Sequence, residues 1–270
     1  MDQPKLVDAI LDVSDRVATL TLDRDDVRNE LTGTALADDI EKTVDWINRT
    51  DHVSVLLITG AGKSFSAGGN IKDMLAKRNG FEGDVYEIQR RYRQGIQRIP
   101  LALARLEVPS IAAINGAAIG AGLDLACMCD LRFSTADALM GESFINVGII
   151  PGDGGGWTLQ QIVGYQRAAE LTFSGRLFNG VEAKQLGVVL EIFERDSLLE
   201  RCLEVARSFA AKPPRALRLT KRLLKSAQRM QVGDFLDQCA LFQGICHNTD
   251  DHIEALNAAL EKRAAVYRGS

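Results

Sequence analysis

The sequence is poor in cysteine and histidine, and neither residue type is arranged as in a metal site or a disulfide framework. Its 270 residues contain five cysteines, an odd number, and three histidines. No Cys-x-x-Cys pair occurs, and Cys127 and Cys129 are too close together for the common zinc spacings. We therefore expect buried free thiols in a reducing compartment and no bound metal ion.

Long hydrophobic runs and an excess of positive charge are also missing. No apolar stretch approaches the roughly 20 residues that a membrane-spanning helix needs, and the N-terminal residues lack the hydrophobic region of a signal peptide. The formal net charge of −4 argues against bulk electrostatic binding of nucleic acid. These features predict a cytoplasmic protein that binds neither membranes nor nucleic acid.

What the sequence does contain is an alternation of strand and helix signals over its first two thirds. Short apolar or alternating runs predict half-buried or buried strands, and an apolar face at positions 36, 40, 44 and 47 predicts a helix. Repeated strand–helix units indicate an α/β fold with a largely parallel sheet covered by helices. The expected strands are Arg16–Leu22, Val53–Thr59, Ser110–Ile114 and Leu131–Ser134.

After about residue 195 the strand signals stop and helical periodicity takes over. We expect an α/β core over residues 1–195 and a helical C-terminal region over residues 196–270. Asp250 or Asp251 is the expected N-cap of the last helix. The polar, arginine-rich segment 72–98 is expected to form a mobile loop and a surface helix. The expected C-terminal helices are Leu198–Ala211, Arg215–Gln228, Phe235–His247 and Asp251–Arg263.

Two glycine clusters carry the strongest functional signal. The first is Ser66-Ala67-Gly68-Gly69-Asn70, and the second lies within Gly116–Asp130. Each follows an expected strand and leads into a helical segment. Free backbone N–H groups at such turns can converge on one oxygen and stabilise negative charge on it. The pattern therefore indicates chemistry that passes through an enolate.

These clusters, with their flanking segments, resemble the crotonase (enoyl-CoA hydratase/isomerase) superfamily. The likeness covers nearly the whole chain in order. It implies a crotonase-like spiral of ββα units, a C-terminal region that mediates trimerisation, homotrimers or hexamers, and an acyl-CoA thioester as substrate with no separate cofactor. The matching segments are Leu56–Gly62, Phe65–Met74, Val108–Gly116, Gly120–Ala126, Cys129–Asp130, Val147–Gly155 and Ala183–Val189.

The resemblance also assigns binding residues. The two oxyanion-hole donors of the family fall at the backbone N–H groups of Gly69 and Ala121. Glycine permits a close approach of the backbone to a ligand, and a helix start favours an anion. Arginines of segment 90–98, or Lys221 and Lys225, could also meet the CoA phosphates. The implied contacts of the CoA thioester are Arg28, Ala67, Gly68, Gly69, Asn70, Ile71, Gly122 and Phe144.

The acid–base groups differ from those of the hydratases in this superfamily, which use two glutamates. The first family position is Asp124 here and the second is Phe144, which can neither accept nor donate a proton. Asp124 and Asp153 are the candidate proton carriers. The alternative role of Asp124 is to place a charge at the start of its helix, and that of Asp153 is to stabilise its turn. Glu142 fits a structural or solvated role better than a catalytic one.

The predicted function is therefore enzymatic, on an acyl-CoA, through a thioester enolate. Double-bond isomerisation of an enoyl-CoA is the first hypothesis, because it needs a single proton carrier. Hydration with one carboxylate, or of an atypical substrate, is the alternative. A third hypothesis is a family member that binds CoA thioesters without efficient catalysis.

Overall fold

Two β-sheets form the centre of the computed structural model, which describes residues 2–270. β1 pairs antiparallel with β2, and the other pairs are parallel. The larger sheet has the order β1 (Ala9–Ser14), β2 (Val17–Leu22), β3 (Val55–Gly60), β5 (Ser110–Ile114), β7 (Leu131–Ser134) and β9 (Glu191–Ile192). The smaller sheet has the order β4 (Ser64–Ser66), β6 (Ala117–Ile119) and β8 (Met140–Gly141).

The chain visits the two sheets alternately. β3, β5 and β7 each enter the larger sheet, and the strand that follows each of them, β4, β6 or β8, enters the smaller sheet before the chain turns into helices. The result is a spiral of ββα units, as the resemblance implied. The four expected strands are confirmed as β2, β3, β5 and β7. β4, β6, β8 and β9 are only two or three residues long, too short for a periodic pattern to reveal.

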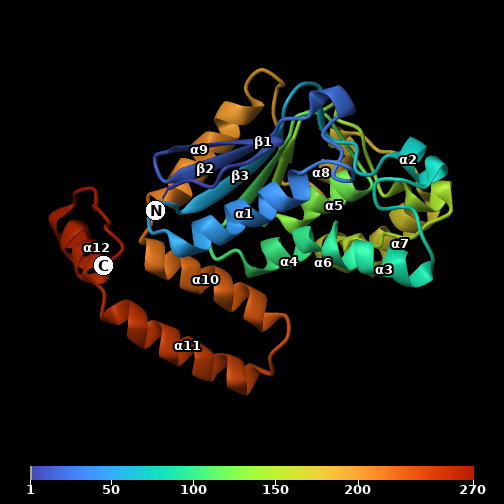
Figure 1. The fold of residues 1–270 in the computed structure, drawn as a ribbon. Helices are drawn as coiled ribbons and strands as arrows, with labels where there is room; N and C mark the ends of the chain where they lie inside the picture. The colour runs from blue at the N-terminus through green and yellow to red at the C-terminus, as the bar shows by residue number, and fades with distance from the viewer. Residues whose placement is uncertain (1) are drawn as a thin grey trace.

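Helices cover both faces of the larger sheet (Figure 1). α1 (Leu36–Arg49) packs with α4 (Arg98–Arg105) on one face, and α9 (Leu198–Ala210) lies over β3 on the other. α5 (Ala121–Met128) is almost entirely buried in the larger of the two hydrophobic clusters. This helix carries Ala121 and Asp124 into the interior of the molecule.

Segment 72–98 contains more helix than the sequence predicted. α2 (Ile71–Ala76) is capped by the Asn70 side chain, which accepts hydrogen bonds from the N–H groups of Lys72 and Asp73. α3 (Val85–Gln94) begins with a capping box between Asp84 and Glu87. The short α2 was missed because one and a half turns show no amphipathic period.

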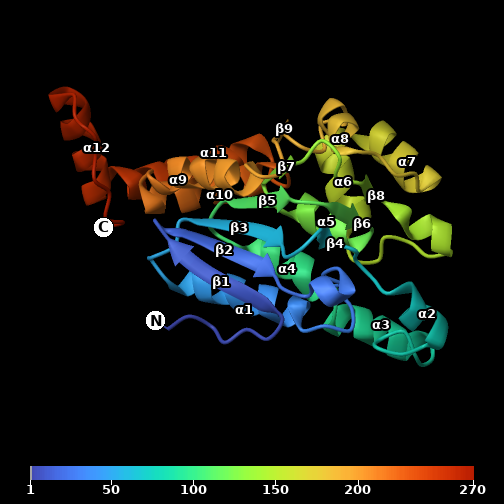
Figure 2. The same ribbon diagram turned by 90° about the horizontal axis from the view of Figure 1, so that it is seen from above.

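Three further helices follow the smaller sheet, and the last three form the C-terminal region. The first group is α6 (Gly155–Val163), α7 (Tyr165–Ser174) and α8 (Gly180–Leu186). The second is α10 (Pro214–Ala227), α11 (Val232–His247) and α12 (Asp250–Glu261). Figure 1 shows α11 lying away from the two sheets, and both views show α12 at the far end of the molecule from the smaller sheet (Figures 1 and 2). Within residues 2–270 no helix is both long and apolar enough to cross a membrane.

All four expected C-terminal helices are confirmed within a few residues, but the predicted N-cap of the last helix was wrong. Thr249 is the N-cap of α12, and its hydroxyl accepts a hydrogen bond from the N–H of His252. Asp250 and Asp251 instead occupy the first turn, where their charges favour the helix dipole. The Asp251 carboxylate accepts hydrogen bonds from the N–H groups of Arg268 and Gly269, which fixes the C-terminal residues.

Candidate active site

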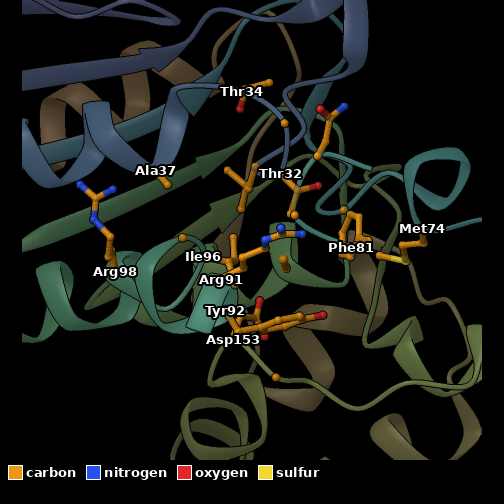
Figure 3. Close-up of a pocket in the computed structure, with 18 of the residues that line it drawn as sticks. Thr32, Thr34, Ala37, Met74, Phe81, Arg91, Tyr92, Ile96, Arg98 and Asp153 are labelled. Atoms are coloured by element: carbon orange, nitrogen blue, oxygen red, sulfur yellow. The ribbon is translucent and has the colours of Figure 1, made fainter. Parts of the chain in front are cut away.

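A cavity of about 220 Å³ lies where α3 faces the turns that lead into α5 and α6. Its lining combines apolar side chains with a few polar groups, as ligand sites usually do. Figure 3 shows Tyr92 and Asp153 together at one side of the cavity, with Thr32, Phe81 and Met74 around the rest. Gly69, Ala121 and Phe144 also line it.

The two glycine clusters meet at this cavity. Gly68 has a φ of +74°, and a Cβ on it would lie 2.4 Å from the Ile119 carbonyl oxygen and 2.9 Å from the Ala121 nitrogen. The turn after β4 therefore lies directly against the turn that enters α5, with no room for a side chain between them. Ala121 is the first residue of α5, so its N–H has no helical carbonyl partner.

The loop before α1 is fixed against the first glycine turn. The Ser66 hydroxyl donates to the Asn29 carbonyl at 2.7 Å and accepts from the Gly68 N–H at 3.1 Å. The N–H of Leu31 donates to the Gly68 carbonyl at 2.8 Å. These bonds join residues far apart in the sequence and hold the turn in one conformation.

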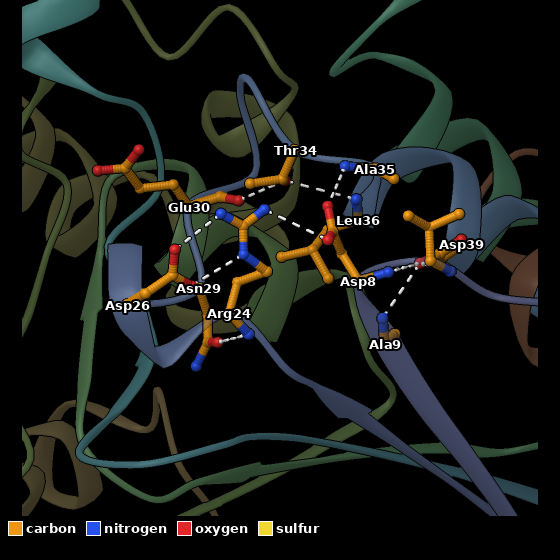
Figure 4. Close-up of polar contacts among 11 residues, drawn as sticks. Asp8, Ala9, Arg24, Asp26, Asn29, Glu30, Thr34, Ala35, Leu36 and Asp39 are labelled. Carbon is orange, nitrogen blue, oxygen red and sulfur yellow. Dashed lines mark hydrogen bonds and ion pairs between the residues drawn. The ribbon is translucent and has the colours of Figure 1, made fainter.

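The same loop is anchored on its other side by charged groups (Figure 4). The Arg24 guanidinium contacts Asp26 at 2.8 Å and Asp8 at 3.2 Å, and the Asn29 side chain accepts from the Arg24 N–H at 2.8 Å. The Asp39 carboxylate accepts from three successive N–H groups of the N-terminal segment. The rim of the cavity is thereby tied to the first strand and to α1.

Asp153, which lines the cavity, belongs to a group of three buried carboxyls. Asp124 comes from α5, Glu142 follows β8, and Asp153 precedes α6; their exposed fractions are 0%, 0% and 4%. Asp124 lies within hydrogen-bonding range of both other carboxyls. A Cβ on Gly155 would fall 2.1 Å from either oxygen of Asp124, so the Asp124 carboxyl packs directly against Gly155, the first residue of α6.

Burial raises the pKa of all three carboxyls. For Asp124 burial is the main cause, and the charges of Asp153 and Glu142 raise its pKa further, to well above the ordinary range. Burial raises the pKa of Glu142 to about 7, against a lowering by its hydrogen bond with Asp124. Burial also raises the pKa of Asp153, opposed by hydrogen bonds from Asp124 and from two backbone N–H groups. The cluster therefore holds protons near neutral pH.

The structure brings together only part of the predicted site. Gly69, Ala121, Phe144 and Asp153 line the cavity, whereas Asp124 does not and reaches it only through Asp153. The remaining predicted contacts lie in the surrounding turns and outside the lining, with Ile71 on the exposed side of α2. These residues are Arg28, Ala67, Gly68, Asn70, Ile71 and Gly122.

Two predicted cationic contacts have other roles here. The Lys221 ammonium is buried, donates to the Val108 carbonyl at 2.6 Å and pairs with Asp130 at 2.7 Å. Lys225 donates to the Leu103 and Ala104 carbonyls. Sequence reasoning missed Tyr92 as a cavity residue, because only the placement of α3 brings it opposite Asp153.

A sequence profile of the family described as Enoyl-CoA hydratase/isomerase matches residues 12–270. The chain belongs to this family. It is 30% identical over 260 residues to the short-chain-enoyl-CoA hydratase of Clostridium acetobutylicum, covering 96% of this chain and 97% of the relative. It is also 30% identical to the 1,2-epoxyphenylacetyl-CoA isomerase of Escherichia coli, covering 94% and 95% of the two chains.

A crystal structure shows the same fold. The enoyl-CoA hydratase from Bacillus anthracis superposes with a TM-score of 0.90 at 29% identity, over 98% of this chain and 100% of that one. This enoyl-CoA hydratase/isomerase family member is accordingly an enzyme with the crotonase fold. Both hydratases and isomerases occur among its relatives, so membership of the family does not by itself specify the reaction.

Proposed function

We propose that this enzyme isomerises the double bond of an enoyl-CoA thioester, with Asp153 as the proton carrier. The observation that carries the proposal is that Asp153 lines the cavity together with Gly69 and Ala121, while Phe144 occupies the place where the resemblance puts the second glutamate of hydratases. One carboxylate at the substrate suffices to move a proton between two carbons. It does not suffice for the two-glutamate addition of water.

In this proposal the N–H groups of Gly69 and Ala121 bind the thioester oxygen. Their turns are in contact through Gly68, and both residues face the same cavity. Hydrogen bonds from these donors strengthen as the carbonyl oxygen gains the negative charge of the enolate, so they stabilise the transition state more than the substrate. The start of α5 adds the favourable end of its dipole.

The proton step balances without water or a redox partner. The Asp153 carboxylate removes a proton from C2 of a 3-enoyl-CoA, the electron pair moves into a dienolate, and the same carboxyl returns the proton to C4. The product is the 2-enoyl-CoA, and the carboxylate is restored. Asp153 is buried among apolar residues, which raises its pKa and makes proton exchange with a weakly acidic carbon easier.

The CoA portion is proposed to leave the cavity over the first glycine turn. Arg28 is exposed on the loop held against that turn, where a guanidinium can meet a phosphate. Backbone groups of Ala67, Gly68 and Asn70 lie along this path, with Ile71 exposed at its edge. Because Gly122 packs against Ser66, its proposed part is to let this turn approach α5.

Hydration is the second candidate, because relatives named as hydratases match nearly the whole chain. The test supplies purified protein with 2-enoyl-CoA and, separately, 3-enoyl-CoA, followed by absorbance and mass spectrometry. Isomerisation interconverts the two substrates without a change of mass. If the 2-enoyl substrate gains the mass of water instead, hydration is the primary reaction and the isomerase proposal is wrong.

We also propose that the enzyme assembles as a homotrimer or hexamer through its C-terminal helices. α11 exposes large apolar side chains on a helix with no buried residue in the single chain. The exposed residues are Val232, Leu236, Leu241 and Ile245. Light scattering coupled to gel filtration tests this proposal, and a monomeric mass at micromolar concentration would contradict it.

A further inference from the structure

Glu142 has a fully buried carboxyl group that does not line the cavity. Neither of its oxygens faces a donor group among residues 2–270, and its hydrogen-bonding neighbour is another carboxyl, Asp124. The same holds for both oxygens of Asp124. Burying an ionised carboxylate without a partner is costly, so this arrangement needs bound protons.

Counting protons fixes how the cluster is arranged. The three carboxyls form a chain in which Asp124 lies between Glu142 and Asp153. Carboxylate oxygens only accept hydrogen bonds, and a protonated carboxyl donates one. A single proton therefore makes one hydrogen bond in the chain, whereas two protons make both. Two protons on three carboxyls leave one negative charge.

That charge belongs on Asp153. The backbone N–H groups of Asp153 and of Gly155, the first residue of the nine-residue helix α6, lower the pKa of its carboxyl against the rise caused by burial. Backbone donors and the N-terminal end of the helix dipole both favour an anion there. Within residues 2–270 both carboxyl oxygens of Asp124 and of Glu142 lack a hydrogen-bond partner, whereas for Asp153 this holds for Oδ1 alone. The two protons are then on Glu142 and on Asp124.

We propose that Glu142 is a positioning residue whose carboxylic acid donates to Asp124, so that Asp124 donates in turn to Asp153 and leaves Asp153 as the anionic base. The inference rests on the proposed function in one respect, that Asp153 is the group that moves the proton. The location of the protons does not depend on which reaction follows.

The other ionisable side chains near the cluster are a thiol, a phenol and a guanidinium. Burial raises the pKa of the Cys127 thiol, on α5, to about 12. Burial, and then the charge of Asp153, raises the pKa of Tyr92 on α3. The Arg132 guanidinium of β7 donates to the Val188 and Cys129 carbonyls. Protonation changes around pH 7 therefore fall on the three carboxyls.

The test compares Glu142→Gln, whose amide still donates a hydrogen bond but does not titrate, with Glu142→Leu, which cannot donate. Glu194→Gln on the exposed surface is the matched control. Wild type should lose kcat above about pH 7, and Glu142→Gln should keep kcat within about threefold and lose this alkaline decline. Glu142→Leu should lower kcat about tenfold or more with KM nearly unchanged, because substrate binding is not touched.

Infrared spectroscopy of the protein without substrate gives a second measurement. In protein labelled with carbon-13 in its glutamates, a carboxylic-acid C=O band should shift with the label and titrate near neutral pH, and Glu142→Gln should lack it. Absence of that band would contradict the proposal that Glu142 is protonated, whichever reaction the enzyme catalyses. A band with unchanged pH profiles and kcat in both variants overturns the positioning role. If Glu142→Leu does not fold, the infrared band and the pH profile of kcat in Glu142→Gln still test the proposal.

Discussion

The cavity has two walls that are built in different ways. The glycine wall consists of Gly69 and Ala121, which line the cavity, and of Gly68 behind them, where two turns are in close contact. The carboxyl wall consists of Asp153, which lines the cavity, and of Asp124 and Glu142 behind it; these side chains come from three separate elements, and their charge depends on bound protons. The first wall is a matter of backbone geometry and the second of electrostatics. Mutations and pH should therefore act on them differently.

The largest effect is expected from Asp153→Asn. The amide cannot accept the substrate proton, so kcat should fall by about 10²–10⁴-fold, the usual contribution of a general base. Binding of a CoA thioester should stay within a few-fold, because the glycine wall is unchanged. Steady-state kinetics and titration calorimetry measure the two quantities.

Asp124→Asn is the matched comparison, since it makes the same change one carboxyl further from the cavity. Asp124 does not line the cavity, so its substitution should lower kcat less than Asp153→Asn. An equal or larger loss for Asp124→Asn would mean that Asp124, rather than Asp153, meets the substrate, and would break the order assigned to the carboxyl wall.

Gly68→Ala should damage the glycine wall by about 10²–10³-fold in kcat/KM. The new Cβ would lie 2.4 Å from the Ile119 carbonyl oxygen, at a φ of +74°, and would force the two turns apart. Displacing one donor of an oxyanion hole has an effect of this size. Unlike the loss in Asp153→Asn, this loss should be the same at every pH.

Gly187→Ala is the control that separates backbone strain from steric clash as the cause of the loss in Gly68→Ala. Gly187 has a similar φ of +81° but open space around a Cβ, so it carries the backbone strain without the clash. It should lose some stability and keep full activity per folded molecule. A comparable loss of activity in Gly187→Ala would show that general destabilisation, and not the glycine wall, explains the result.

The same difference between the walls decides what the sequence could predict. Each turn of the glycine wall has a local sequence signal, because it joins a strand to a helix and its glycines, Gly68 and Gly69 or Gly120 and Gly122, lie close together in the sequence. The carboxyl wall depends on packing at a distance. The sequence predicted a structural or solvated role for Glu142. Nothing near Glu142 in the sequence shows that the pairing of β8 with β6 buries it beside α5. Proton sharing is a property of three segments together.

Stability should report the carboxyl wall without any substrate. Folding raises the pKa of Glu142 from its ordinary 4.5 to about 7, so the folded state binds this proton more tightly than the unfolded state does. Its contribution to stability is complete below about pH 4.5 and is lost as the pH rises through about 7. The free energy of unfolding of wild type should fall relative to Glu142→Gln by on the order of 1–3 kcal/mol over this range. Urea unfolding of both proteins at several pH values measures this difference in the free energy of unfolding.

The smallest effect is expected from Tyr92→Phe, which tests where the carboxyl wall ends. Tyr92 lines the cavity beside Asp153, and burial raises the pKa of its phenol, so it stays neutral at working pH. Its hydroxyl can orient Asp153 or the substrate but carries no charge. Removing it should lower kcat by less than about fivefold, the scale of one neutral hydrogen bond, and leave the pH profile in place. A displaced alkaline limb in Tyr92→Phe would show that the proton-sharing network extends beyond the three carboxyls to α3.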